Sequence, residues 1–586
     1  MRIDRPTLRI LLIPILILSS ISASAFGQTL EFAEDFSTSN FRDSALTTAN
    51  WSIAESVVKL ATPIPRSATF APPINLDEDP RLSAAARFAD VDGDGFLDIL
   101  LGSSGDFTFL GDEALEGTLG QYTSESRTYL NNGTTDPFLG VAGIPITYET
   151  HTVELASLGD LNGDGTIDFV VSRVDKPPVI FFNNGTSDPW AGVTGREVGI
   201  HFYHTEDIGV ADLNGDGHLD LLGTNGGENG GEPSIVYLNN GTNDPFQGVE
   251  GVFIPTAAHA AESLVLGDVN GDGFIDFIQG NGTEGGEDPT SQLNRVYLNN
   301  GTANPFEDVV GLDIGAEANF TKDVMLGDVD LDGDLDLVVG NDYPEPNLLY
   351  LNNGTDNPFG EVAPSVIQSS THLTLSVVLA DMNCDGLLDL IEGNVLAPIR
   401  ILLNNGTSEA FTGVEPILIP TGETNDLVAS EDLDVGDPDL DGDLDIAVAM
   451  HRFPEGVPSR FFKNQGDLDT SGVVLSSTGY CLHRNTAVSL GIDTTSKLIL
   501  SATLTAQSTL PPNTSIQFWM TNNGGKKWFL VKPAQSFEFP TFGTDLRWKA
   551  ELLSRSPALT PELKEIRVNA LLGPTLSGVD RWDWYD

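Results

Sequence analysis

The sequence predicts an all-β protein, a seven-bladed β-propeller followed by a β-sandwich domain. The first reason is a repeated acidic motif, Asp-x-[Asp/Asn]-x-Asp-Gly-x-x-Asp, whose copies begin at Asp90, Asp160, Asp212, Asp268, Asp328, Asp381 and Asp437. Copies 52 to 70 residues apart suit one four-stranded blade each. The second reason is an apolar strand running into Asn-Gly between successive copies, at Asn131, Asn183, Asn239, Asn299, Asn352, Asn404 and Asn464. We interpret each as a hairpin turn, so every unit supplies at least four short strands.

The N-terminus predicts export. Arg2, Arg5 and Arg9 precede an apolar run from Ile10 to Leu18, and the residues that follow end in Ala-Ser-Ala. This pattern is typical of a secretory signal peptide over residues 1–27, cleaved after about Ala25 or Gly27. No stretch approaches the ~20 apolar residues of a membrane span, so we expect a secreted protein, extracellular or at the cell surface, without a transmembrane segment.

Charge divides the chain into two regions and excludes some partners. The protein has 29 Lys and Arg against 85 Asp and Glu, a net charge of −56. Residues 467–586 are neutral, with 11 basic and 11 acidic side chains, so the whole deficit lies in residues 1–466. A nucleic acid or an anionic membrane requires a basic face and is not expected as the main partner. The two cysteines, Cys384 and Cys481, lie in different regions, so we expect no disulfide framework.

Residues 28–62 contain short apolar segments and Trp51 but no repeat, and form a separate N-terminal β segment. One arrangement is that this segment packs on the C-terminal sandwich, with the propeller inserted between them. The propeller is expected to span residues 63–466.

Each acidic loop offers the oxygen ligands that Ca²⁺ prefers. Side chains at positions 1, 3, 5 and 9 and the carbonyl of position 7 can coordinate the ion, and Gly at position 6 permits the sharp turn. The ligand sets are Asp90, Asp92, Asp94, Phe96 and Asp98; Asp160, Asn162, Asp164, Thr166 and Asp168; Asp212, Asn214, Asp216, His218 and Asp220; Asp268, Asn270, Asp272, Phe274 and Asp276; Asp328, Asp330, Asp332, Asp334 and Asp336; Asp381, Asn383, Asp385, Leu387 and Asp389; Asp437, Asp439, Asp441, Asp443 and Asp445. We expect about seven structural Ca²⁺ ions, because otherwise neighbouring carboxylates repel one another and the loops fray.

An EF-hand shares positions 1 to 9 but needs an acidic ligand at position 12 and flanking helices. Only Glu392 would supply that ligand, and the flanking segments read as strands. The loops are therefore expected to join two strands.

In this order of acidic loop, apolar strand and Asn-Asn-Gly, the units resemble the FG-GAP and VCBS repeats of integrin-α-type β-propellers. Cys384, Leu331 and Leu440 depart from the usual Gly at position 4 of their loops. The resemblance implies a seven-bladed disc with its calcium loops on one face, joining the first and second strands of each blade. It implies extracellular binding or adhesion rather than a defined reaction.

A second register lies upstream and downstream of the loops and predicts a ring at the mouth of the central channel. Its members are His151, His204, His259 and His372; Glu154, Glu206, Glu262 and Glu431, with Lys322 in the fifth unit; and Asn225, Asn281, Asn341 and Asn394. Such a ring could bind a sugar, a peptide or a transition metal. The competing interpretation is that these are strand-end residues that hydrogen-bond between blades.

Residues 467–573 lose both repeats and alternate apolar and polar residues, which predicts a β-sandwich, followed by a tail at 574–586. Trp519, Trp528 and Trp548 are expected in its core rather than stacking on sugars.

Two classes of function follow. The first is a secreted calcium-stabilised propeller, expected to be monomeric, that binds an extracellular protein or polysaccharide in adhesion or recognition. The alternative is a carbohydrate-active enzyme such as a polysaccharide lyase, although the sequence shows no catalytic motif and catalysis is the less favoured class.

Overall fold

The computed structural model describes residues 28–34, 36, 42, 50–52, 57–59, 65–76, 82–103, 125–146, 153–226, 232–282, 292–316, 318–342, 344–367, 372–421, 428–452, 457–466, 484–492 and 497–575. Every regular element in these ranges is a β-strand. In the same ranges no helix has the length and apolar character needed to cross a membrane.

Seven four-stranded antiparallel sheets follow one another along the repeat region. The first four are β5 (Ser83–Ala89), β6 (Asp98–Ser103), β7 (Ser126–Tyr129) and β8 (Ile144–Ile146); β9 (Val153–Gly159), β10 (Asp168–Arg173), β11 (Val179–Phe181) and β12 (Arg196–Glu197); β13 (Thr205–Ala211), β14 (Asp220–Asn225), β15 (Glu232–Tyr237) and β16 (Val252–His259); β17 (Ala261–Gly267), β18 (Asp276–Asn281), β19 (Arg295–Tyr297) and β20 (Leu312–Asp313). The other three are β21 (Thr321–Gly327), β22 (Asp336–Asn341), β23 (Asn347–Tyr350) and β24 (Ser365–Ile367); β25 (Thr374–Ala380), β26 (Asp389–Asn394), β27 (Ile399–Leu402) and β28 (Ile417–Ile419); β29 (Val428–Gly436), β30 (Asp445–Arg452), β31 (Arg460–Phe462) and β4 (Ile74–Asn75).

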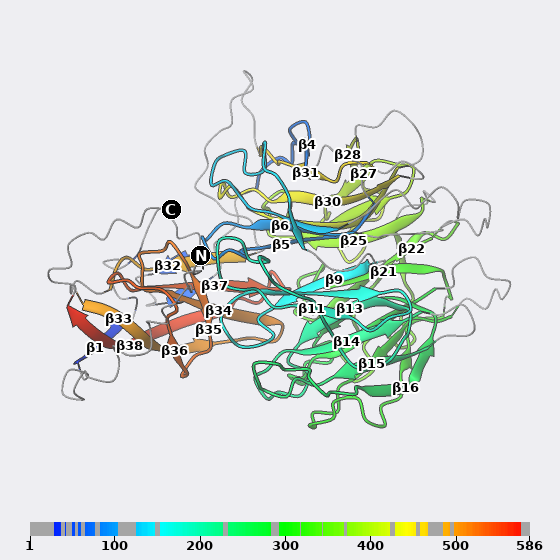
Figure 1. Cartoon of the computed structure of the whole chain (residues 1–586). Helices are drawn as coiled ribbons and strands as arrows, with labels where there is room; N and C mark the ends of the chain where they lie inside the picture. The colour runs from blue at the N-terminus through cyan, green and yellow to red at the C-terminus, as the bar shows by residue number, and fades with distance from the viewer. Residues whose placement is uncertain are drawn as a thin grey trace, which may run out of the picture.

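These sheets form a β-propeller, which confirms the expected fold class. The first strand of each sheet contacts the first strand of the next, from β5 round to β29 and back to β5 (Figure 1). The last sheet takes its outer strand from the other end of the repeat region, because β4 pairs with β31 through Asn75 and Arg460. The chain thereby closes the ring through the outer strand of the last sheet.

The second strands explain why the blades pack. In six of them, from β6 to β26, every residue is buried, as in the run Asp336–Asn341. A strand covered on both faces by neighbouring sheets tolerates apolar side chains at every position rather than at alternate ones. The continuous apolar runs after each acidic loop therefore reflect blade-to-blade packing.

The sandwich consists of two further sheets. One contains β2 (Asn50–Ser52), β3 (Val57–Lys59), β38 (Glu562–Thr575), β33 (Lys497–Thr509) and β36 (Ser536–Glu538), with β1 (Gln28–Glu34) also paired to β38; the other contains β32 (Arg484–Val488), β37 (Arg547–Ser554), β34 (Thr514–Thr521) and β35 (Phe529–Val531). The N-terminal strands are thus part of the sandwich, which lies at the left of Figure 1. In the sequence, the propeller is inserted between these strands and the C-terminal strands of the sandwich. Phe36 and Val58 share the core of the sandwich with Trp548, as expected for a core residue. Trp519 and Trp528 are also buried, but in a separate cluster that packs against Ile167 of the propeller.

Two expectations need correction. The Asn-Asn-Gly segments are not tight hairpin turns: β7 ends at Tyr129 and β8 begins only at Ile144, so Asn131 opens a longer loop. In that segment Gly133 has a positive φ of 68° but the asparagines do not. Cys384 is disulfide-bonded, against the expectation of no disulfide. Cys481, the other cysteine of the sequence, lies outside the described residues.

Candidate functional site

The acidic loops each connect the first and second strands of a sheet, as expected. The first loop, between β5 and β6, shows how the sequence shapes them: Gly93 and Gly95 have φ values of 73° and 101°, a region that L side chains rarely adopt. The backbone N–H of Gly95 donates to Asp90 Oδ2 at 2.9 Å, and that of Phe96 donates to Asp94 Oδ1 at 2.9 Å. The loop is therefore folded around its own carboxylates.

The donor set fits Ca²⁺. In the first, fifth and seventh loops, carboxylate oxygens from positions 1, 3 and 5 lie within 4.8 Å of one another. Asp90 Oδ1 is buried and has no hydrogen-bond partner among the described residues. Burial raises the pKa of Asp90 to about 7 and that of Asp336 to about 8, with added repulsion from the other loop carboxylates. A hard cation held by these oxygens would remove both the repulsion and the desolvation penalty. Asp90, Asp92 and Asp94 would hold it in the first loop, with the equivalent residues in the others.

Position 9 of each loop is tied to the Asn of the following Asn-Asn-Gly segment. Asn131 N–H donates to Asp98 Oδ1 at 2.8 Å, and the same bond recurs in all seven sheets. The Asn side chain then reaches the preceding blade, since Asn183 Nδ2 donates to Val91 O at 2.7 Å. At the ring closure Asn131 Nδ2 donates to Pro438 O at 2.8 Å. The recurrent asparagine is a blade-to-blade link, a role that the turn interpretation missed.

The sandwich lies on the acidic-loop face of the propeller. Trp528 N–H donates to Gly93 O at 2.6 Å and Leu530 N–H donates to Gly165 O at 2.8 Å. Asn513 Nδ2 donates to Asp268 O at 2.8 Å, and Ser556 Oγ donates to Asp328 Oδ2 at 2.5 Å. Lys532 Nζ also donates to Gly217 O of the third loop at 2.6 Å. Loops one to five are therefore in direct contact with the sandwich.

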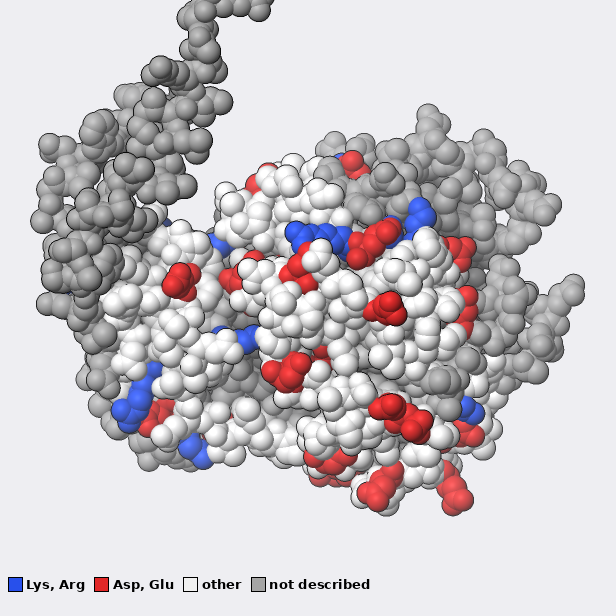
Figure 2. Space-filling model, turned by 60° about the horizontal axis from the view of Figure 1, so that its bottom comes forward, with Lys and Arg blue, Asp and Glu red and all other residues white. Residues whose placement is uncertain are grey.

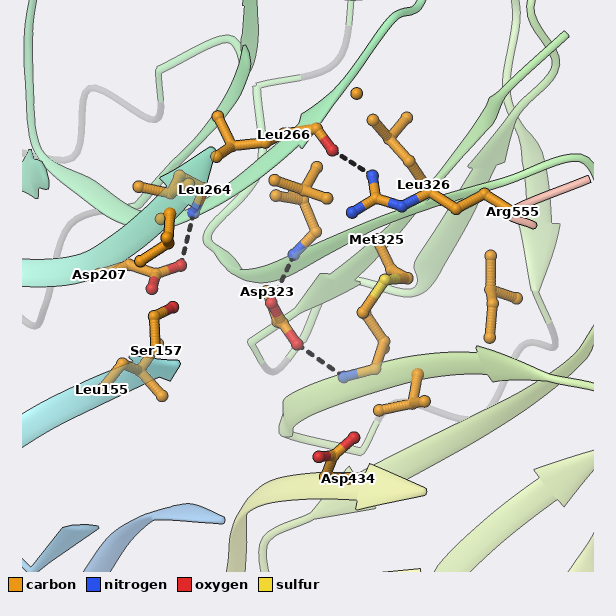
Figure 3. Close-up of a pocket in the computed structure, with 18 of the residues that line it drawn as sticks. Leu155, Ser157, Asp207, Leu264, Leu266, Asp323, Met325, Leu326, Asp434 and Arg555 are labelled. Atoms are coloured by element: carbon orange, nitrogen blue, oxygen red, sulfur yellow. Dashed lines mark hydrogen bonds between the residues drawn. The ribbon is translucent and has the colours of Figure 1, made fainter. Parts of the chain in front are cut away.

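A cavity of about 1020 Å³ runs along the first strands at the centre of the ring. Residues 510–515 and 553–555 of the sandwich line the end near the acidic loops, where the Arg555 guanidinium donates to Leu266 O (Figure 3). The volume is in the range of sites that bind small ligands or single side chains. The sandwich thus caps one end of the channel.

The other end of the cavity is lined by residues that β-bulges turn inward. The pairing of β13 with β14 shifts between Thr205 and Asp207, which makes Glu206 the extra residue, and equivalent shifts occur in the other sheets. A bulge re-aims the side chain of its extra residue. Glu206, Glu262, Lys322 and Glu431 all line the cavity, as the upstream register predicted.

This ring is charged and internally paired. Lys322 Nζ lies 2.9 Å from Glu262 Oε2, and His451 Nδ1 lies 2.9 Å from Glu431 Oε1. His204 Nε2 lies 3.2 Å from Glu206 Oε1. His451 was not predicted, because it stands at the end of β30, where the other blades carry no histidine.

Deeper in the channel, aspartates clamp adjacent blades together. Asp207 Oδ2 accepts the N–H of Leu264 at 2.9 Å, and Asp323 Oδ2 accepts that of Val377 at 2.8 Å (Figure 3). Asp432 and Asp434 accept from Ala86 at 3.0 Å and from Phe88 at 2.7 Å, across the ring closure. The sequence register did not reveal these residues, since only some blades carry Asp at that position.

Burial shifts the titration of the channel aspartates. The pKa is raised to about 6 for Asp207 and Asp434 and to about 7 for Asp323, because burial disfavours the charged form more than the backbone N–H bonds favour it. One cation, Arg87, lies among these channel aspartates in the part of the chain that the structure describes. Its guanidinium donates a hydrogen bond to Asp432.

His204 pairs with Glu206 but does not itself line the cavity. His151 and the side chain of Glu154 lie outside the described residues. His259 and His372 do not line the cavity; burial lowers the pKa of each, helped by Arg295 and Arg400 respectively.

The prediction that four asparagines belong to this ring was wrong. Their side chains are fully buried and form local hydrogen bonds. Asn225 Oδ1 accepts from Thr205 Oγ1 at 2.9 Å, and Asn225 Nδ2 donates to Pro233 O at 2.6 Å. Local hydrogen bonds of the same kind hold the amide side chains of Asn281, Asn341 and Asn394. These four residues join strands within a blade and are not available to a ligand.

Carboxylates are also present on the accessible surface. Figure 2 shows one face of the molecule, with red Asp and Glu side chains spread over it and blue Lys and Arg side chains at fewer places. This agrees with the net charge of −56.

Three segments match the FG-GAP-like repeat family, at residues 160–223, 212–278 and 328–392. No curated protein matches the chain. Among solved structures, BBS1N in complex with ARL6DN is 9% identical, with a TM-score of 0.41, over 70% of this chain and 100% of that one. An exo-β-1,3-galactanase from Phanerochaete chrysosporium with galactose is 11% identical, with a TM-score of 0.29, over 72% of this chain and 97% of that one.

Proposed function

Because the chain carries FG-GAP-like repeats on a β-propeller, we propose that it is a secreted, calcium-stabilised recognition protein. It binds its extracellular ligand at the end of the central channel that faces away from the sandwich. The observation that carries this proposal is the bulge-borne ring of Glu206, Glu262, Lys322 and Glu431, because bulges that aim charged side chains into one cavity are typical of binding sites.

The charge of the channel favours a ligand with a positively charged group. Three glutamates and His451 lie with one lysine at the ring, the deeper aspartates face Arg87, and Arg555 lies at the capped end, where it donates to Leu266 O. Lys322 and Arg87 are already paired, with Glu262 and Asp432. A protein segment that presents Lys or Arg suits this cavity better than an anionic polysaccharide, which would meet like charge.

A polysaccharide lyase remains the second candidate, on the strength of the His451–Glu431 pair. An imidazole oriented by a carboxylate at 2.9 Å is a suitable general base at the edge of a cavity. A lyase also needs a cation to neutralise the substrate carboxylate. Lys322 could supply that charge only if its ion pair with Glu262 were broken.

An array experiment tests both candidates. The labelled full chain is applied, in the presence of Ca²⁺, to basic peptides, extracellular-matrix proteins, and neutral and anionic polysaccharides. We expect retention on the basic peptides or proteins, and loss of that retention in Glu206→Gln/Glu431→Gln. Glu250→Gln/Glu415→Gln, which removes two exposed carboxylates outside the cavity, is the matched control.

Equal binding by the ring variant and the wild type would place recognition elsewhere. Cleavage of a bound anionic polysaccharide that is lost in His451→Gln would favour the lyase instead.

A further inference from the structure

The fifth and seventh acidic loops form a natural pair for comparison. Asp328 to Asp336 reads Asp-Val-Asp-Leu-Asp-Gly-Asp-Leu-Asp, and Asp437 to Asp445 differs from it only by Pro438 in place of Val329. In both loops the oxygens of positions 1, 3 and 5 lie within 4.8 Å of one another. By their own residues the two loops should bind the same ion.

Their surroundings differ at the residue that precedes the Asn-Asn-Gly segment. Six blades carry an apolar residue there, namely Leu130, Phe182, Leu238, Leu298, Leu351 and Leu403. The seventh blade carries Lys463, whose ammonium is hydrogen-bonded to Asp439 Oδ2 and lies 3.5 Å from Asp441 Oδ2. Lys463 Nζ also donates to Thr135 O at 2.8 Å, and the Asp439 side chain is fully buried by the contact.

A second cation reaches the same loop from the other end of the repeat region. Arg66, eight residues before β4, donates from Nη1 to Asp443 Oδ1 at 2.5 Å, and both side chains are buried. The backbone N–H of Arg66 donates to Asn383 O in the sixth loop. The segment that closes the ring therefore brings its own positive charge to the seventh loop.

The seventh loop also lacks a bond that the other six share. In each of those loops the N–H of position 2 donates to Oδ2 of the position 9 aspartate, as Val329 does to Asp336 at 2.9 Å. Pro438 has no N–H, so Asp445 Oδ2 has no partner among the described residues. The substitution itself accounts for this unpaired oxygen.

We propose that the seventh loop binds no calcium, because Lys463 occupies the carboxylates of positions 3 and 5 that the ion would need, while Arg66 adds positive charge beside them at Asp443. The ammonium contacts the ligand oxygens of positions 3 and 5, so a cation entering the loop would face both a blocked site and like charge. The inference rests on the proposal that the other loops bind Ca²⁺, and its consequence is that the blade that closes the ring is held without metal.

The first loop does not share this arrangement. Lys549 Nζ lies 3.9 Å from Asp90 Oδ2 but is paired at 2.9 Å with Glu551, and Lys527 donates to the carbonyl of Asp92 rather than to its carboxylate.

Two reciprocal single substitutions in the full chain test the proposal. Lys463→Leu gives the seventh blade the residue of the fifth, and Leu351→Lys does the reverse. Bound calcium per chain is measured by equilibrium dialysis with elemental analysis, and circular dichroism confirms the fold. We expect Lys463→Leu to bind one ion more than the wild type, Leu351→Lys one fewer, and the double variant the same number. An unchanged number in Lys463→Leu would overturn the proposal.

A calcium-soaked crystal of the wild type reads the same difference directly, and it does so even if Lys463→Leu fails to fold. Anomalous density in the fifth loop with none in the seventh supports the proposal. Density in both loops overturns it and leaves calcium stabilisation intact, whereas density in neither overturns both.

Discussion

The aspartates at the two ends of the first strands have opposite requirements. Those of the acidic loops, such as Asp90 and Asp94, lie beside other carboxylates, and burial raises their pKa to about 7 and about 6. Those of the channel, such as Asp207 and Asp323, accept N–H groups from the next blade. We propose that the loop carboxylates are neutralised by an added cation, whereas the channel carboxylates accept hydrogen bonds from the ring itself. Under the proposed calcium binding, the same type of side chain would hold a metal at one end of a strand, and it links neighbouring blades at the other.

Removal of calcium by a chelator should have the largest effect on stability, and it should act on the loop aspartates rather than on the channel aspartates. One bound ion at a hundredfold excess over its Kd stabilises the fold by about 2.7 kcal/mol, and several loops act together. We expect excess EDTA to lower the thermal midpoint by more than about 10 °C, measured by calorimetry. Added Ca²⁺ should restore the midpoint and Mg²⁺ should restore it poorly, because Mg²⁺ demands a rigid octahedral site. An unchanged midpoint would reject structural calcium.

Asp432→Ala should remove the contacts that a channel aspartate makes across the ring closure. It removes the acceptor for Ala86 N–H and leaves Arg87 without its carboxylate partner. We expect a loss of about 2–4 kcal/mol in the free energy of unfolding, with calcium binding retained. Urea denaturation at saturating Ca²⁺ measures it. Asp207→Ala is the matched control inside the ring and should cost less, since Asp207 forms no ion pair with any residue that the structure describes; equal losses would argue against a special role for the closure.

The pH dependence of stability should come from the channel group once the loops hold calcium. The folded pKa values of about 6 for Asp207 and about 7 for Asp323 exceed the unfolded value of 3.8. Their stabilising protonation is complete below pH 4 and is lost as the pH rises through 6 and 7. Each group contributes at most about 1.4 kcal/mol per pH unit. Asp323→Asn should flatten the slope of unfolding free energy between pH 5 and 7 at saturating Ca²⁺, and an identical slope would contradict the assignment.

Asn131→Ala should give the smallest loss of stability and tests the hydrogen bond that joins the first blade to the seventh loop. It removes the bond to Pro438 O across the closure, at a cost of about 1–2 kcal/mol in urea denaturation. Asn239→Ala is the control, because Asn239 Nδ2 forms the equivalent bond to Leu161 O at 2.8 Å between blades inside the ring. We expect an equal loss there, and a clearly different one would show that the closure link is not equivalent to the others.

Local pattern predicted more of the fold than of the recognition site. The acidic loops and the strands that follow them were visible because their ligand spacing and apolar runs lie within a few residues. The upstream register found Glu206, Glu262, Lys322 and Glu431, although it could not show that bulges aim them inward. It also selected Asn225 and its equivalents, since a strand-end polar residue looks the same whether it faces a channel or a neighbouring strand.

Contacts between distant segments could not be predicted in this way. The β4 strand that closes the ring and the pairing of β1 with β38 join residues far apart in the chain. The asparagine links were hidden because Asn-Gly has a sufficient local explanation as a turn.

The sequence by itself determined the repeating unit: the composition of the acidic loops, the strand that each precedes, and the negative charge that the propeller must neutralise. Only the tertiary structure decided what neutralises it. Loops five and seven are nearly identical in sequence, yet Leu351 flanks one while Lys463 and Arg66 reach the other. Coulomb interactions depend on distance in space, and ring closure sets that distance by bringing Arg66 and Asp443 together from opposite ends of the propeller.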